Sequence, residues 1–539
     1  MTGFPRIHHS TSWSVLAVAA LAAASCRPGP AKPLPSSGGQ SGTAATGVGG
    51  SAGSAGATGQ SGGSRASGDS TGSGGQTRSG GTSGSGGAAG AGSGGSAGGT
   101  LGSGATRGSG GTSGSGGSGG SGGFGATVEV RDAALPDVIA DAPPPSRGPT
   151  PSQTGMKFPF PQNRENSRCI YPSFYRNEDV QAAYQQWKND TVTPDGAKGF
   201  RRVKRPNDPG LDANSTVSEG IGNGMLIAVY MNDQALFDDL WQYEQQHLGQ
   251  YGLMDWNIKA DGSGPTTGGS GPATDADEDM AFALAMADKQ WVTSTTLNKK
   301  YIDIAKGTIT TIWNNEIYNY KYVKPWPTAE SSTINLSYFA PAYYKLFAKI
   351  DTANTTNWTN TVDNMYQVLN ASLNSSNGNA DNGLVPAWCD GSGKPNGGAF
   401  GPGQSSPTNY QYDSCRTPFR IGLDWCWNGE TRAQAYVAKT SKFFNGITVA
   451  NMVDGYDLNG SPHAQYQTGS KSQVQSAAFI GPASVGAMSN VIYQSFVNDA
   501  YGVLTTGKAL VGGTYYDDSW MVMSLLMMTA NFLDYTAYP

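Results

Sequence analysis

The segment from Ala273 to Trp291, ATDADEDMAFALAMADKQW, joins a cluster of acidic residues to a long helical pattern. Met280, Leu284 and Ala287 recur with Trp291 at i, i+4, i+7 and i+11, and this spacing places all four on one face of a helix. We expect that face to be buried. The segment therefore brings a candidate chemical cluster and a well-specified part of the scaffold together.

The acidic residues at the start of this helix also have a purely structural interpretation. Thr274 and Asp277 have the spacing of an N-terminal capping box, which would place Asp275 at the first helical position, where the helix dipole favours its charged form. The alternation of Asp275, Asp277 and Asp279 resembles an EF-hand loop, but Met280 occupies the position that such a loop gives to Gly. We exclude a calcium loop here.

The composition limits the classes of partner. The chain has 539 residues, a net charge of −5 and only 14% charged residues, so it offers no basic surface for nucleic acid. Its 25 Tyr and 12 Trp suit a protein that stacks flat, uncharged rings, although a large core also uses them. No Cys-x-x-Cys spacing indicates a metal site, and we expect neither metal nor cofactor.

The N-terminus reads as an export signal. Residues 1–25 combine Arg6 with an apolar run from Trp13 to Ala24, too short for a permanent membrane span. Ala23-Ala24-Ser25-Cys26 is similar to a bacterial lipobox, so Cys26 is a candidate lipidation site, with cleavage without lipidation as the alternative. We expect a secreted or lipid-anchored protein at the cell surface, in contact with the membrane only through that anchor. In such an oxidising compartment Cys169, Cys389, Cys415 and Cys426 allow three pairings, which the sequence leaves open.

The chain divides by composition. Residues 26–125 are almost entirely Gly, Ser, Ala and Thr and cannot bury enough apolar surface to fold, so they form a disordered linker. Residues 126–155 are acidic and Pro-rich and form a stiffer spacer. We expect residues 156–539 to form the folded domain.

That domain is predicted to be all-α. Twelve helical patterns, separated by Gly, Pro, Asn and Ser, indicate an (α/α)6 barrel of six hairpins, with an α-solenoid as the alternative. The predicted helices are 177–189, 218–231, 234–247, 276–291, 296–315, 335–349, 357–374, 414–427, 431–444, 473–488, 490–502 and 518–534.

A second acidic cluster is SEGIGNGM, residues 218–225. Thr216 and Glu219 have capping-box spacing, which is the structural interpretation of Glu219. The glycines at positions 220, 222 and 224 weaken the helix, and we expect them to allow close approach of a ligand such as a sugar ring. Their spacing differs from the Gly-x-Gly-x-x-Gly of a dinucleotide site.

A third cluster is YDSCRTPFRIGLDW, residues 412–425. Asp413 and Arg416 have the i, i+3 spacing of an ordinary ion pair. An arginine that keeps a carboxylate ionised is also what a catalytic base requires.

Together with YYDDSWMVMSLLMMTANF near the C-terminus, these clusters resemble glycoside hydrolase family 8 over roughly Tyr171 to Phe532. The resemblance implies an inverting (α/α)6-barrel enzyme that cleaves β-1,4-linked glucans, xylans or chitosan. It also implies roles for single residues. These are Glu219 as general acid, Asp413 as general base, Asp275 as the ligand of the distorted sugar, Trp256 and Tyr338 as sugar contacts, Tyr412 and Arg416 as residues that orient the base, and Asp277 as a further substrate-binding residue.

Two features bear on this assignment. Asn223 stands where the family usually has an aromatic residue, which puts one sugar contact in doubt, while Asp413 after Tyr412 matches the glucan and xylan branch. A first-turn position favours ionised Glu219, whereas a general acid must hold its proton, so burial or the charge of Asp275 has to raise its pKa.

We therefore expect an exported, monomeric endo-β-1,4-glycanase that acts on polysaccharide. An endoglucanase is the first expectation, and a xylanase or chitosanase of the same family is the alternative. A tethered carbohydrate-binding or adhesion module without activity is the alternative from another class.

Overall fold

A computed structural model describes residues 158–206, 213–294, 296–397, 407–463, 475–506 and 515–538. The predicted signal peptide, linker and spacer lie outside the described residues, as does Cys26. Within the described ranges no helix has the length and apolar character needed to cross a membrane.

The described part of the chain contains twelve α-helices, and their positions are close to those of the twelve predicted segments. They are α2 Asn177–Thr191, α3 Ser218–Tyr230, α4 Gln234–Gln245, α5 Thr274–Gln290, α6 Tyr301–Glu316, α7 Pro341–Ile350, α8 Thr355–Ser372, α9 Thr417–Asn428, α10 Thr431–Ile447, α11 Ala477–Ala487, α12 Gln494–Thr506 and α13 Tyr515–Met528.

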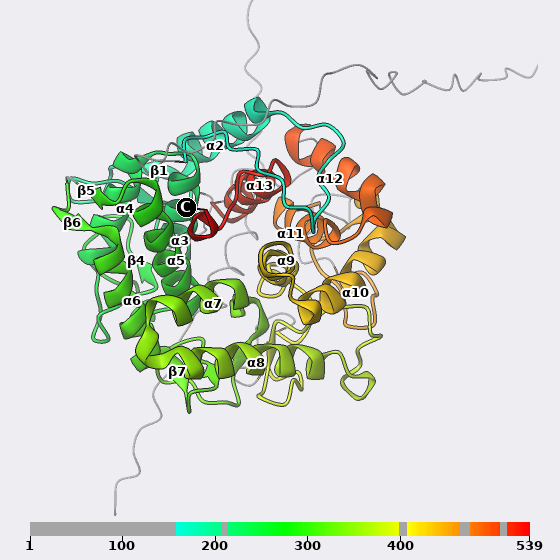
Figure 1. The fold of residues 1–539 in the computed structure, drawn as a ribbon. Coiled ribbons are helices and arrows are strands. Elements are labelled where there is room, and N and C mark those ends of the chain that lie inside the picture. The colour runs from blue at the N-terminus through cyan, green and yellow to red at the C-terminus, as the bar shows by residue number, and fades with distance from the viewer. Residues whose placement is uncertain are drawn as a thin grey trace, which may run out of the picture. The chain divides into compact units, whose positions relative to one another are not determined.

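The helices form two concentric rings (Figure 1). Helices α3, α5, α7, α9, α11 and α13 contact one another in that order, and α13 closes the ring against α3. Helices α4, α6, α8, α10 and α12 each pack outside the inner helix that precedes them in the chain, and α2 packs against α13. This is the predicted (α/α)6 barrel, and the closed ring excludes the solenoid.

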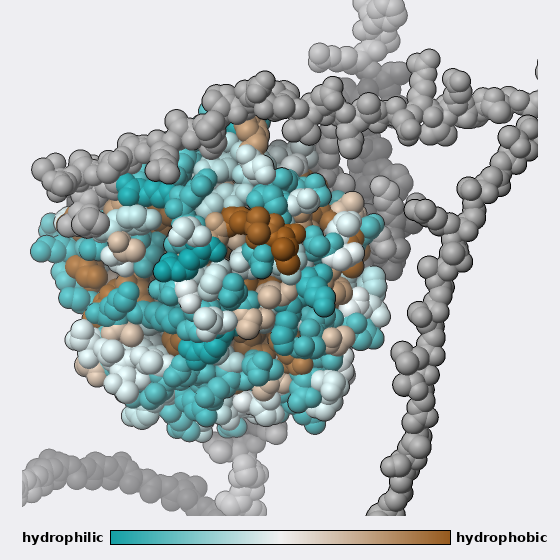
Figure 2. Space-filling model, turned by 45° about the vertical axis from the view of Figure 1, so that its right-hand side comes forward, coloured by the Kyte–Doolittle hydropathy of each residue, from teal (hydrophilic) through white to brown (hydrophobic). Residues whose placement is uncertain are grey.

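Most residues of the inner helices are buried, on whichever side of the helix they lie. Every residue of α11 and α13 is buried, and in α5 the buried set includes Met280, Leu284 and Ala287 together with the acidic first turn. Trp291 follows α5 and is only partly buried. The sequence predicted one buried face for this segment, but residues on its other faces are buried as well. The reason is that an inner barrel helix has neighbours on every side. The face drawn in Figure 2 is mainly hydrophilic, with small hydrophobic patches.

Ten short strands form five two-stranded antiparallel ladders among the described residues. They are β1 Val192–Thr193 with β2 Arg202–Val203, β3 Thr216–Val217 with β4 Asn257–Ile258, β5 Thr293–Ser294 with β6 Lys299–Lys300, β7 Ile317–Tyr318 with β8 Tyr322–Val323, and β9 Ile334–Asn335 with β10 Trp388–Cys389. In the third ladder β3 leads directly into α3, and the register pairs Val217 with Asn257. This ladder brings the start of α3 beside Trp256.

Both predicted capping boxes are wrong. Helix α5 begins at Thr274, whose hydroxyl donates to the carbonyl of Lys324 at 2.5 Å, and no side chain caps this helix. Thr216 lies in β3, where its hydroxyl donates to the carbonyl of Val203 at 2.9 Å instead of capping α3. In each case the threonine hydroxyl donates to a backbone carbonyl of another segment and does not cap the helix. The acidic residues of the predicted boxes are therefore not engaged in capping.

The glycines of α3 serve helix packing. A Cβ atom at Gly222 would lie 3.0 Å from the carbonyl oxygen of Ala276, and one at Gly224 would lie 2.8 Å from Leu240. The expectation that these glycines admit a sugar ring is therefore wrong. They allow α3 to approach α5 and α4 closely.

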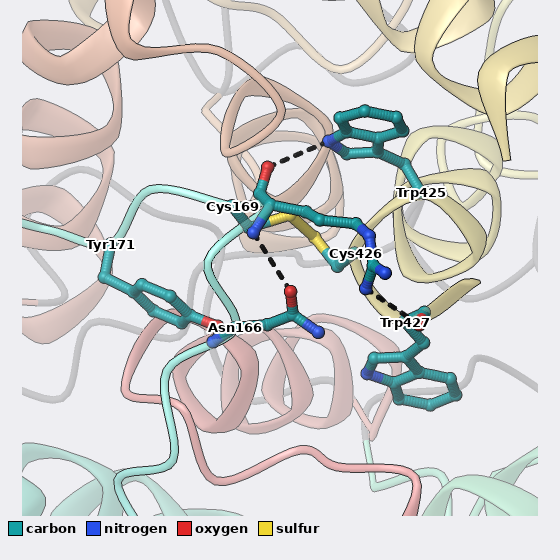
Figure 3. The surroundings of a disulfide bond; sticks show 7 residues. Asn166, Cys169, Tyr171, Trp425, Cys426 and Trp427 are labelled. Atoms are coloured by element: carbon teal, nitrogen blue, oxygen red, sulfur yellow. Dashed lines mark hydrogen bonds between the residues drawn. A yellow bond between two sulfur atoms is a disulfide. The ribbon is translucent and has the colours of Figure 1, made fainter. Parts of the chain in front are cut away.

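A disulfide ties the segment before α2 to the barrel. Of the three pairings left open, the structure has Cys169 joined to Cys426 near the end of α9, while Cys389 and Cys415 are buried free thiols. Figure 3 shows the surroundings of this bond, where the indole of Trp425 donates to the carbonyl of Arg168 at 3.0 Å. The bond and its neighbours hold the entering chain against an inner helix.

Candidate active site

The candidate residues gather at one end of the inner ring. Glu219 and Asp275 are the second residues of α3 and α5, Arg416 directly precedes α9, and Tyr515 begins α13. Each lies in the first turn of an inner helix or next to it. The barrel therefore brings together residues that are far apart in the sequence.

Arg416 is the centre of the group. Its Nη1 donates to Asp275 Oδ2 at 2.5 Å and also to Glu219 Oε1, while its Nε donates to the hydroxyl of Ser337 at 3.0 Å. The side chain is 2% exposed. A guanidinium buried this completely needs charged partners, and the two carboxyl groups supply them.

Glu219 is held by two different donors. Its Oε1 accepts from Arg416, and its Oε2 accepts from the hydroxyl of Tyr515 at 2.8 Å. Burial raises its pKa to about 7, the nearby charges of Asp275 and Asp413 also raise it, and Arg416 and Tyr515 act in the opposite direction. A position at the start of a helix favours the ionised form of Glu219, but burial has the larger effect and raises its pKa.

Asp413 has its own set of donors. Its Oδ2 accepts from the indole of Trp388 at 3.2 Å and from the amide of Gln411 at 3.3 Å, and its Oδ1 lies 3.8 Å from Arg416 Nη2. The i, i+3 ion pair predicted from the sequence is therefore long. Arg416 makes closer contacts with Glu219 and Asp275, and Trp388 and Gln411 are the nearer partners of Asp413.

Two of the predicted tyrosines line this group. The ring centre of Tyr338 lies 5.2 Å from the guanidinium carbon of Arg416, which is a cation–π arrangement. Tyr412 turns its hydroxyl away to Asp454 at 3.2 Å, and its ring meets Phe479 edge to face. Tyr412 thus fixes the segment that carries Asp413 through packing.

Trp256 lies beside the group, at an adjoining pocket. Its carbonyl accepts from the backbone amide of Ser218, directly before Glu219, at 2.9 Å. It shares with Trp326 the lining of an open pocket of about 400 Å³. Trp256 is only 3% exposed, so the partly buried Trp326 offers more of the flat apolar surface on which a sugar ring can stack.

Two residues considered from the sequence lie in the protein interior. Asp277 is fully buried, and among the acidic groups that act on it Glu316, at the end of α6, has the largest effect. Asn223 is also fully buried, one turn below Glu219 on α3, so position 223 belongs to the core and not to a sugar contact.

A second buried ion cluster lies one turn deeper in the barrel. Arg420 donates from Nη1 and Nη2 to the two oxygens of Asp279 at 2.8 and 2.9 Å, and its Nη1 lies 3.0 Å from Glu278. Asp279 and Arg420 follow Asp275 and Arg416 by four residues on α5 and α9. The Arg420–Asp279 contact therefore repeats the Arg416–Asp275 contact four residues further along the same two segments.

Sequence reasoning missed Tyr515, Trp388 and Gln411. Tyr515 begins YYDDSWMVMSLLMMTANF, and the resemblance of this segment was the one signal that could have identified it. Trp388 contacts Asp413 because β10 pairs with β9 close to Tyr338, and this pairing joins positions 335 and 388. Such a contact has no local signature.

This (α/α)6 barrel holds one carboxyl whose pKa is raised to about 7, a second carboxyl close to it, and a neighbouring pocket lined by two tryptophans. These are features of a glycoside hydrolase. The sequence matches the family model for glycosyl hydrolases family 8 over residues 158–530. The chain belongs to this family and is a cellulase-like glycoside hydrolase.

Curated relatives agree with this membership. The chain is 37% identical to Endoglucanase A of Acetivibrio thermocellus over 358 residues, which cover 66% of this chain and 69% of the relative. It is 34% identical to Endoglucanase 2 of Ruminiclostridium josui over 397 residues, which cover 72% and 80% of the two chains.

Solved structures show the same fold. The apo structure of a β-1,3-1,4-glucanase from Paenibacillus sp. X4 matches with a TM-score of 0.61 and 27% identity, covering 69% of this chain and 98% of that one. Rex8A from Paenibacillus barcinonensis, complexed with xylose, matches with a TM-score of 0.55 and 19% identity, covering 67% and 95%.

Proposed function

We propose that this protein is an exported endo-β-1,4-glucanase that hydrolyses its polysaccharide with inversion at the anomeric carbon. The observation that carries this proposal is the contact of one buried guanidinium, Arg416, with both Glu219 and Asp275, next to Asp413. Of these carboxyl groups, Glu219 has a pKa raised to about 7, which suits a group that must give up a proton near neutral pH.

Glu219 is the general acid and Asp413 the general base. Glu219 donates its proton to the glycosidic oxygen as the bond to the anomeric carbon breaks. Asp413 removes a proton from the water that attacks this carbon from the opposite face. Glu219 must then regain a proton and Asp413 must lose one before the next turnover. We expect their carboxyl groups to lie roughly 6.5–9.5 Å apart, the range that leaves room for this water.

Asp275, Tyr338 and the tryptophan pocket bind the substrate. Asp275 is oriented by Arg416 and would accept hydrogen bonds from the hydroxyls of the distorted sugar at the cleaved bond. Trp256 and Trp326 would stack on sugars further along the chain of the polymer. Asp277 is buried away from this surface, so we no longer place it with the substrate-binding residues.

The choice of glucan rests on the relatives. Those at 33–37% identity are named endoglucanases, whereas those named xylose-releasing exo-oligoxylanases are 24–26% identical. Release of reducing ends from carboxymethylcellulose and lichenan, exceeding release from xylan and chitosan, is the expected result. Faster release from xylan would favour a xylanase, and binding without new reducing ends would favour a non-catalytic module.

Export and anchoring are part of the proposal. The lipobox-like Cys26 would carry the lipid, and the Gly/Ser segment would let the barrel reach an insoluble polymer. Cys26→Ser should move intact enzyme from the membrane fraction to the soluble fraction. Unchanged fractionation would remove the anchor from the proposal and leave the catalytic assignment as it is.

A further inference from the structure

Two carboxyl groups face each other in the interior behind the candidate active site. Asp277 lies in the first turn of α5, and Glu316 is the last residue of α6. Both residues are fully buried, and among the described residues no donor reaches their four carboxyl oxygens with standard hydrogen-bond geometry. The hydroxyl of Thr274 also acts on Glu316, but it donates to the carbonyl of Lys324 at 2.5 Å. Each is the other's close neighbour.

The surrounding charges do not neutralise this pair. Glu244 on α4 and Asp275 on α5 are both acidic, and both act on Asp277. Lys324, after β8, is a cation that acts on Glu316, but its Nζ donates to the carbonyl of Pro327 at 2.6 Å. Tyr344 on α7 also faces Glu316 and carries no charge at neutral pH, since its pKa is raised well above its ordinary value by burial. Two ionised carboxylates in this position would each be desolvated and would repel each other.

A single proton resolves the conflict. If one carboxyl is protonated, it donates to the other, and two unsatisfied acceptors become one strong hydrogen bond. Burial raises the pKa of Glu316 to about 8 and places the pKa of Asp277 well above its ordinary value. The pair therefore retains a proton at neutral pH.

The pair lies where two functional segments meet. Lys324 donates its backbone amide to the carbonyl of Glu316 at 2.8 Å, and the backbone amide of Thr274 donates to the carbonyl of Pro325 at 3.2 Å. Segment 324–327 is thus attached to the end of α6 and to the start of α5. This segment contains Trp326 of the pocket, while the start of α5 carries Asp275.

We propose that Asp277 and Glu316 share one proton and act as positioning residues that hold the first turn of α5, with Asp275, against the segment that carries Trp326. Neither residue touches the substrate. The catalytic consequence rests on the proposed function, whereas the shared proton itself does not.

The shared proton makes the stability of the barrel depend on pH. In the unfolded chain both carboxyls ionise above about pH 4.5, whereas in the folded protein burial keeps the pair protonated from there to neutral pH. Folding therefore takes up a proton across this window, and the stability that the pair contributes at low pH is lost as the pH rises.

The test compares Glu316→Gln with wild type in thermal and urea unfolding from pH 5 to pH 8. The Gln amide donates to Asp277 without a titrating proton, so the variant should take up about one proton fewer on folding and should gain relative stability as the pH rises. Glu178→Gln, at an exposed position of α2, makes the same chemical change and should follow wild type. Parallel pH profiles for wild type and Glu316→Gln would overturn the proposal.

Two further readouts separate positioning from simple structural support. The infrared difference spectrum between wild type and Glu316→Gln should contain the band of a protonated carboxyl at pH 7, and its absence would contradict the shared proton.

Glu316→Ala should lower kcat on a soluble glucan by roughly tenfold to a hundredfold, and Glu316→Gln should restore it at pH 6. If Glu316→Ala stays folded with wild-type kcat, the positioning role is wrong, while the unfolding profiles still decide the proton. If wild type itself has no glycanase activity, the proposed function fails and the stability test stands unaffected.

Discussion

Tyr515 donates its hydroxyl to Glu219 Oε2 at 2.8 Å from the first residue of α13, 296 positions further along the chain. Arg416, the other donor to Glu219, can only donate, whereas a tyrosine hydroxyl can donate or accept. Tyr515 can therefore keep its contact with Glu219 in both protonation states, which a general acid passes through in every turnover.

Tyr515→Phe should move the alkaline limb of the activity profile upward. The hydroxyl of Tyr515 lowers the pKa of Glu219, which is about 7 in the intact site, so its removal raises that pKa by on the order of one unit. The alkaline limb of kcat/KM against pH reports the pKa of Glu219 in the free enzyme, so it shows this shift. Tyr320→Phe, at a tyrosine that is 63% exposed, is the matched control and should leave the profile unchanged. A limb that stays in place in Tyr515→Phe would show that this contact does not tune the acid.

Glu219→Gln and Asp413→Asn should each reduce kcat by roughly 10²–10⁴-fold, because each removes one of the two proton-transfer groups without changing side-chain size. Circular dichroism should remain that of the wild type. NMR of the first product from a β-linked oligosaccharide should show the α-anomer. Appearance of the β-anomer first would invalidate the two roles even if both residues proved essential.

Arg416→Lys should impair both stability and activity. Lysine keeps the charge but loses the planar fork that contacts Glu219 and Asp275 together, so at least one buried carboxyl is left without a partner. A loss of about 3 kcal/mol in the free energy of unfolding follows, measured by urea denaturation. Arg432→Lys makes the same change at an arginine that is 44% exposed, where about 1 kcal/mol or less is expected. Equal losses in the two variants would argue against Arg416 as the centre of the site.

Cys169→Ser should lower stability and leave the chemistry intact. The disulfide closes a loop of 257 residues and holds the segment before α2 against the end of α9, the opposite end of that helix from Arg416. Its removal should cost roughly 2–4 kcal/mol, read as a lower Tm, with kcat at 25 °C close to that of the wild type. Addition of a reductant to the wild type should reproduce the shift, and a variant with unchanged Tm would show that the bond adds nothing to the fold.

Removal of residues 1–155 should leave the Tm and the activity on soluble glucan unchanged. Apart from the apolar run of the predicted signal peptide, the removed segment is rich in Gly and Ser and offers few apolar side chains to a core. Activity on insoluble cellulose by whole cells is the matched comparison, since only there should the tether matter. A lower Tm in the truncated protein would mean that part of this segment packs on the barrel.

Much of the fold follows from local pattern. The helical spacing of apolar residues and the Gly, Pro and Asn clusters between segments predicted twelve helices, and α4, α5 and α10 begin within two residues of the predicted positions. The predicted starts of other helices were less accurate. Helices α6 and α7 begin five and six residues later than predicted. There the short strand β6 and Asn335 of β9 take residues that the pattern assigned to helices.

The sequence by itself determined the helical class, the six-hairpin barrel and the three acidic segments, because periodicity and motif spacing are properties of neighbouring residues. Only the tertiary structure decided which groups share Arg416, why the pKa of Glu219 lies near 7, that Trp388 serves Asp413, and that Asp277 turns inward to Glu316. Each of these depends on burial or on contact between segments far apart in the chain. Desolvation and ion pairing depend on distance in space, and a closed barrel sets those distances only when its last inner helix packs against its first.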